Sequence, residues 1–88
     1  MTYQDIEALT IKKEGNSLEF KESTGQLDRS METLCAFLNG EGGTILYGVK
    51  DDGKIIGQTV SDSTKRSIAE AVNRIEPFVD LEITYVAI

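Results

Sequence analysis

The spacing of apolar residues changes twice in the first half of the chain, and this change constrains the fold most strongly. Residues 18–22 alternate apolar and charged side chains, which is typical of a strand with one buried face. Residues 27–38 carry apolar side chains at helical spacing, and Asn39-Gly40 is a typical helix end. Residues 44–49 are then almost wholly apolar, which predicts a buried strand. The pattern indicates a helix that packs on a sheet.

Four further elements complete the expected fold. A short helix follows the capping residue Thr2, and Asp51-Asp52-Gly53 predicts a hairpin turn that leads into a strand at residues 54–57. A second amphipathic helix precedes Pro77, and a last strand alternates apolar and polar residues over 79–85. We therefore expect an α+β fold. It would be a two-layer sandwich with a mixed four-stranded sheet, two amphipathic helices and a short N-terminal helix.

The length of 88 residues provides for one small domain, residues 1–88. The last expected strand runs to Ile88, and Val86 and Ile88 add apolar side chains to its second face. An exposed apolar edge strand would promote aggregation. We therefore expect that the chain is a truncated domain of a longer polypeptide, or that this strand pairs with a second copy in a homodimer.

The amino-acid composition limits the available chemistry. The chain has no His and a single Cys, Cys35, so Ser–His and Cys–His relays, zinc knuckles and intramolecular disulfides are excluded. Any catalysis has to use carboxylates, lysines, hydroxyls, tyrosines or a bound hard metal ion. No apolar run approaches the ~18 residues of a membrane span, and the first residues do not resemble a secretory signal. We expect a cytoplasmic protein without a membrane partner.

The net charge of −6 argues against a protein that coats nucleic acid by charge alone. Five lysines nevertheless lie near the expected sheet: Lys12, Lys13, Lys21, Lys50 and Lys54. They are candidate contacts for nucleic-acid phosphates, and the alternative is ordinary solvated surface charge. The glycine-rich segment 39–44 lacks the Gly-Lys-Ser/Thr ending of a phosphate-binding loop, so we interpret it as a helix end.

Three motifs in order carry a resemblance to a known family. They are residues 14–21 (Glu-Gly-Asn-Ser-Leu-Glu-Phe-Lys), residues 36–53, and Ile56-Gly57. Over roughly residues 14–85 the sequence resembles the Schlafen/AlbA-like DNA-binding domain, which in bacteria usually lies at the N-terminus of predicted transcriptional regulators. The resemblance implies binding of nucleic acid, DNA or RNA.

In the Schlafen branch the resemblance also implies an RNA-cleaving site of three carboxylates, which by motif position are Glu14, Glu19 and Asp51. Such a site would bind Mg²⁺ or Mn²⁺ and activate water, with Lys21 on the scissile phosphate. Glu14 and Glu19 would lie on opposite faces of a straight strand, so they converge only if Gly15-Asn16 bends the chain. The alternative is that all three acids are solvated residues of a loop, a strand and a turn.

Three functions therefore remain open at this level. The leading one is a nucleic-acid-binding domain of a bacterial transcriptional regulator, without enzymatic activity. The second is a divalent-metal-dependent ribonuclease that uses the three carboxylates. The third is an oligomerisation module that assembles through its C-terminal strand.

Overall fold

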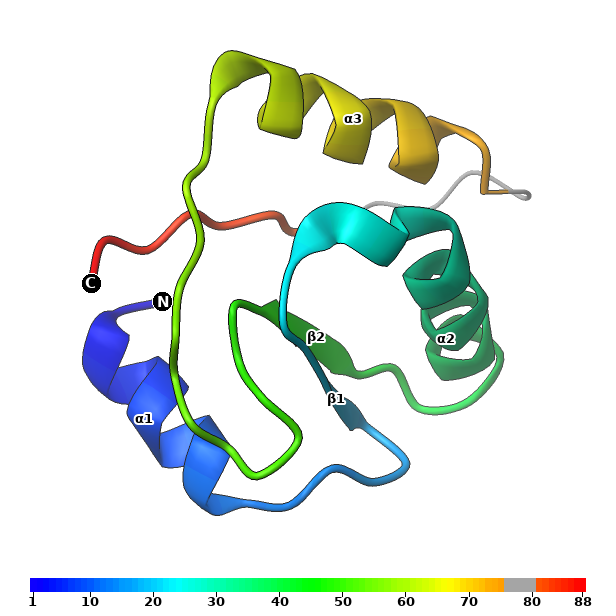
Figure 1. Cartoon of the computed structure of the whole chain (residues 1–88). Helices are drawn as coiled ribbons and strands as arrows, with labels where there is room; N and C mark the ends of the chain where they lie inside the picture. The colour runs from blue at the N-terminus through cyan, green and yellow to red at the C-terminus, as the bar shows by residue number, and fades with distance from the viewer. Residues whose placement is uncertain (76–80) are drawn as a thin grey trace.

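A computed structural model describes residues 1–75 and 81–88. Its elements in chain order are α1 (Tyr3–Ile11), β1 (Leu18–Lys21), the 3-10 turn η1 (Thr24–Gln26), α2 (Leu27–Asn39), β2 (Thr44–Tyr47) and α3 (Asp62–Asn73). Figure 1 shows the two strands at the centre, with α1 on one side and α2 on the other. In this view α3 lies above α2.

The two strands run parallel, because α2 carries the chain back to the start of the sheet. Their register runs from Leu18 opposite Thr44 to Lys21 opposite Tyr47. Alternate residues of each strand face opposite sides of the sheet, and the apolar side faces α1. The core on that side combines buried side chains of the strand region with partly buried ones packed against them: Leu18, Phe20, Leu46, Val49, Ile6, Leu9 and Ile55.

Side-chain caps fix the first turns of α1 and α3, whereas α2 begins without a side-chain cap. Thr2 Oγ1 accepts a hydrogen bond from the Asp5 N–H at 3.2 Å, and the Asp5 carboxylate accepts one from the Thr2 N–H at 2.8 Å. Ser61 and Thr64 form the same reciprocal capping box at α3. The hydrogen bonds with Thr2 lower the pKa of Asp5. The box of α1 therefore stabilises the fold at neutral pH and loses this contribution as the pH falls through that pKa.

The prediction of a two-layer sandwich with a mixed four-stranded sheet is wrong, because helices lie on both sides of the sheet (Figure 1) and the sheet is smaller. Within residues 1–75 and 81–88 the sheet consists of β1 and β2, and both are parallel. The turn at residues 50–53 forms as expected, with a hydrogen bond of 2.8 Å from the Gly53 N–H to the Lys50 C=O. The expected strand after it makes only one isolated bridge, Val49 to Ile55.

Two glycines explain why this hairpin stays so short. Gly48 has φ +88° and Gly57 has φ +70°, so the backbone leaves the extended conformation on both sides of the bridge. The Gly48 C=O accepts hydrogen bonds from the Ile56 and Gly57 N–H groups, each at 2.8 Å. A Cβ on Gly48 would come within 2.9 Å of the Gly57 Cα. This close approach of two backbones therefore replaces a strand ladder.

The expected C-terminal strand is also absent from residues 81–88, and the expected start of that strand at 79–80 lies outside the described residues. The Lys65 Nζ lies 5.0 Å from the centre of the Tyr85 ring, and Ile88 lies against Gly57. In Figure 1 the segment runs beside α3 and makes no ladder. An alternating pattern makes a segment able to pair, but a strand also needs a neighbouring edge. Pairing with a second copy stays a prediction.

The sequence predicts no membrane-spanning segment, and the length and apolar character of the helices bear on this prediction. None of those in residues 1–75 and 81–88 combines the length and the apolar character that crossing a bilayer requires.

Candidate functional site

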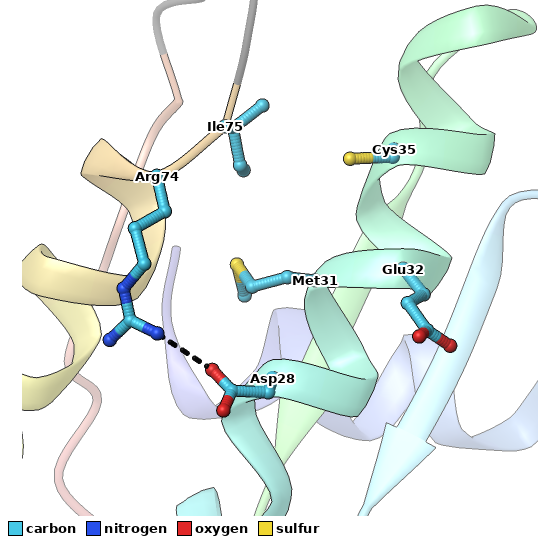
Figure 2. Close-up of a pocket in the computed structure, with 6 residues that line it drawn as sticks. All are labelled: Asp28, Met31, Glu32, Cys35, Arg74 and Ile75. Atoms are coloured by element: carbon cyan, nitrogen blue, oxygen red, sulfur yellow. Dashed lines mark hydrogen bonds and ion pairs between the residues drawn. The ribbon is translucent and has the colours of Figure 1, made fainter.

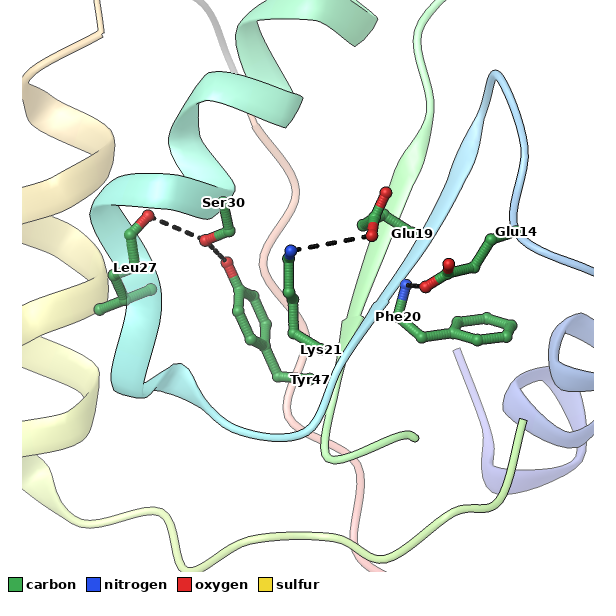
Figure 3. Close-up of polar contacts among 7 residues, drawn as sticks. All are labelled: Glu14, Glu19, Phe20, Lys21, Leu27, Ser30 and Tyr47. Atoms are coloured by element: carbon green, nitrogen blue, oxygen red, sulfur yellow. Dashed lines mark hydrogen bonds and ion pairs between the residues drawn. The ribbon is translucent and has the colours of Figure 1, made fainter. Parts of the chain in front are cut away.

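Glu14 caps the outer edge of β1. The chain bends at residues 15–17, where the Gly15 N–H donates to the Leu18 C=O at 3.0 Å. The same bend brings Glu14 Oε1 to the Phe20 N–H, which donates to it at 2.7 Å (Figure 3). The bend expected at Gly15-Asn16 therefore forms, but it directs the Glu14 carboxylate to a backbone group of β1.

Replacement of Glu14 tests this capping role. We expect Glu14→Ala to lower the free energy of unfolding by about 1–3 kcal/mol, because it leaves the partly buried Phe20 N–H without its partner. Glu14→Gln keeps an acceptor oxygen and is expected to recover most of this loss. Urea unfolding measures both, with exposed Glu22→Ala as the control. Equal destabilisation by Ala and Gln would contradict the capping role.

Glu19 and Lys21 lie on the face of the sheet opposite the α1 core. The Lys21 Nζ is 3.7 Å from Glu19 Oε1, and their side chains are 22% and 27% exposed. Tyr47, which is paired with Lys21 across the strands, donates its hydroxyl to Ser30 Oγ on α2 (Figure 3). The Ser30 hydroxyl donates in turn to the Leu27 C=O at 2.8 Å. The hydrogen bonds of Tyr47, Ser30 and Leu27 form a polar network that joins α2 to the sheet.

The pH titration of Tyr47 reports on that network. Burial raises the pKa of the Tyr47 hydroxyl above the ordinary 10.0, and the hydrogen bond with Ser30 opposes the shift in part. The folded state therefore favours the neutral hydroxyl, so this stabilisation is complete below about pH 10 and is lost as the pH rises through the raised pKa. We expect tyrosinate absorbance to show a late step that Tyr47→Phe removes. A late step that survives in this variant would contradict the assignment.

The structure does not bring the three predicted carboxylates together. Glu14 is engaged by the Phe20 N–H and Glu19 by Lys21, while Asp51 is exposed in the turn after β2. Among the described residues, no group of three or more Asp, Glu or Cys side chains is placed to hold a metal ion. As arranged, these residues do not fit Mg²⁺ or Mn²⁺. The metal site stays a prediction of the family resemblance.

Four of the five predicted lysines belong to two adjoining segments. Lys12 caps the C-terminal end of α1, with Lys13 next to it, and Lys50 and Lys54 enclose the turn after β2. The Lys50 N–H donates to the Lys54 C=O at 2.9 Å, which closes the turn. A Cβ on Gly53 would lie 2.7 Å from the Thr10 C=O oxygen, so the turn packs against the end of α1. We call Lys12, Lys13, Lys50 and Lys54 the basic end.

The four lysines of the basic end are accessible to a ligand. All four are exposed, and the ion pairs seen within residues 1–75 and 81–88 engage Lys21 and Arg74 instead. Asp52, within the turn, directs its carboxylate to the Lys54 N–H at 2.9 Å. The four ammonium groups of the basic end therefore outnumber the two exposed carboxylates of its turn, those of Asp51 and Asp52, on an acidic chain. Lys21, on the α2-facing side of the sheet, does not belong to it.

A groove of about 410 Å³ between α2 and the end of α3 has the opposite character (Figure 2). Its one guanidinium, that of Arg74, lies 3.0 Å from the Asp28 carboxylate, and Glu32 adds a second negative charge. Cys35 is partly exposed in this groove, beside the apolar side chains of Met31 and Ile75. The groove therefore disfavours phosphate, and the basic end remains the better candidate.

Three of these arrangements could not be predicted from the amino-acid sequence. Neither the Glu14 cap, nor the contact of Gly53 with Thr10, nor the Tyr47–Ser30 hydrogen bond follows from spacing. The Gly-Asn dipeptide after Glu14 did signal a bend, but a bend does not specify which group the carboxylate meets.

Comparison with known proteins identifies the family. The family model described as Schlafen, AlbA_2 matches residues 14–88, so the chain belongs to the Schlafen AlbA_2 family. The match leaves out α1 and the first two lysines of the basic end. No curated protein and no solved structure matched the chain.

Proposed function

We propose that the chain is a nucleic-acid-binding module whose basic end contacts the phosphate backbone. Its setting would be the cytoplasm of a bacterium, as the DNA-binding part of a transcriptional regulator. The observation that carries the proposal is the packing of the 50–53 turn against the end of α1, which unites Lys12 and Lys13 with Lys50 and Lys54. Membership of the Schlafen AlbA_2 family supports the same class of ligand.

The physical basis is release of counterions from phosphate. Each lysine that neutralises a phosphate releases condensed cations, so a cluster of four ammonium groups can bind even when the whole chain carries a charge of −6. The acids outside the basic end repel the backbone and restrict the contact to this end of the molecule, whereas Asp51 and Asp52 within its turn weaken the attraction of the four lysines. Binding is therefore expected to be moderate and strongly dependent on salt.

A binding titration tests the proposal. The chain is titrated into fluorescently labelled RNA and labelled duplex DNA, in EDTA and at several salt concentrations, with fluorescence anisotropy as the readout. We expect binding in EDTA that weakens steeply as salt rises. Absence of binding at low salt to both nucleic acids would contradict the proposal.

The same samples separate binding from cleavage. A metal-dependent ribonuclease would degrade the labelled RNA in Mn²⁺, and both chelator and Asp51→Ala would stop the degradation. We expect intact RNA under all these conditions, because the described structure does not assemble the three carboxylates. Degradation that depends on Mn²⁺ and Asp51 would instead establish the enzymatic alternative.

A further inference from the structure

A second depression, of about 440 Å³, lies beside the basic end, at the edge where both strands begin. Lys12 belongs to its lining and links it to the basic end. The rest of the lining comes from Leu9 of α1, from Ser17 and the first residue of β1, Leu18, and from the loop residues Glu41, Gly42 and Gly43 with the first residue of β2, Thr44.

The walls of this depression combine apolar and flat surfaces. Leu9 and Leu18 supply aliphatic side chains, and Gly42 and Gly43 present backbone without side chains. Gly43 can only be glycine without rearrangement, because a Cβ there would lie 2.6 Å from the Phe37 ring. A flat, partly apolar surface suits a planar ring better than a tetrahedral phosphate.

The backbone of the glycine-rich loop is committed to the fold. The Gly42 N–H donates to the Phe37 C=O at 2.8 Å, and the Thr44 N–H donates to the Ser17 C=O at 2.9 Å. These N–H groups are therefore not free to cradle a phosphate. The charged groups of the depression are the Lys12 ammonium and the exposed Glu41 carboxylate.

We propose that this depression takes one unpaired nucleobase that carries an exocyclic amino group, with Lys12 on the adjoining phosphate and the Glu41 carboxylate accepting from the amino group. The inference rests on the proposed function and extends it from the backbone to a base. A carboxylate accepts from the N4 amino group of cytosine, whereas uracil presents a carbonyl oxygen at that position. The ligand class is therefore single-stranded nucleic acid, with cytosine favoured over uracil.

Labelled oligocytidine and oligouridine of equal length provide the test. We expect the chain to bind oligocytidine at least about fivefold more tightly than oligouridine. Glu41→Gln is expected to remove this preference, because an amide both donates and accepts. If Glu41 acted only through its negative charge, Glu41→Gln would bind both oligomers more tightly by an equal factor, and the preference would be unchanged.

Glu70→Gln is the matched control, since it removes the same charge from an exposed position of α3, which does not line the depression. It is expected to keep the preference for oligocytidine. Equal binding of the two oligomers by the unmodified chain, or a preference that survives Glu41→Gln, would overturn the base pocket while the proposed function stands. Failure to bind either oligomer at low salt would also overturn the base pocket, and the proposed function would fall with it only if duplex DNA does not bind either.

Discussion

Replacement of Phe20 by alanine is expected to remove a large part of the stability of the chain and to lower its melting temperature strongly. Phe20 is 2% exposed and lies in the core between the sheet and α1, with Leu18, Leu46 and Val49. Truncation of a buried Phe to Ala costs about 3–5 kcal/mol. A domain of this length has a total stability of only about 4–13 kcal/mol, so the loss is comparable with the lower part of that range. Circular dichroism during thermal unfolding measures the effect.

Ile11 offers the matched control, because it is also a large apolar residue but is 84% exposed at the end of α1. Ile11→Ala is expected to change the free energy of unfolding by no more than about 0.5 kcal/mol. A Phe20→Ala variant that melts at the temperature of the unmodified chain would show that the core does not lie between α1 and the sheet.

Removal of lysines from the basic end is expected to have the largest effect on binding. If all four contact phosphate, the logarithm of the affinity should fall with the logarithm of the salt concentration with a slope of about −3 to −4. Lys12→Gln/Lys13→Gln and Lys50→Gln/Lys54→Gln should each reduce the magnitude of that slope by about 2. The combined variant should lose on the order of a hundredfold in affinity at low salt.

The double variant Lys65→Gln/Arg66→Gln removes the same charge from the first turns of α3. It is expected to leave the slope almost unchanged, since long-range attraction between separated charges is screened. If this pair reduces the slope as much as either lysine pair does, the binding surface lies elsewhere. All variants must retain the far-ultraviolet spectrum of the unmodified chain, because binding is compared only between folded proteins.

Much of the local structure followed from the sequence because its determinants are local. Thr2 caps α1 as expected, and the alternation of Leu18 with Phe20 identified the buried face of β1. The helix expected from residue 27 to the Asn39-Gly40 end has those bounds in the structure. In each case the residues that decide the outcome are within a few positions of it.

The failures concern contacts between distant segments. Positive φ at Gly48 and Gly57 ends the hairpin after one bridge. The sequence shows a glycine at each position, but it does not show which backbone conformation that glycine adopts. The alternation of Ile83 and Tyr85 signals a segment able to pair, but not whether an edge lies beside it. The candidate site depended on contacts of the same kind. Spacing placed Glu14 near β1, yet the partner of its carboxylate is a backbone N–H.

The basic end is tested most directly by mapping the bound surface with nuclear magnetic resonance. Amide shifts of the isotopically labelled chain are followed as a short single-stranded oligonucleotide and, in a second titration, a short DNA duplex are added in EDTA. The account predicts that the largest changes fall in residues 10–13 and 50–54. Changes confined to α3, or spectra that do not respond at low salt, would contradict it.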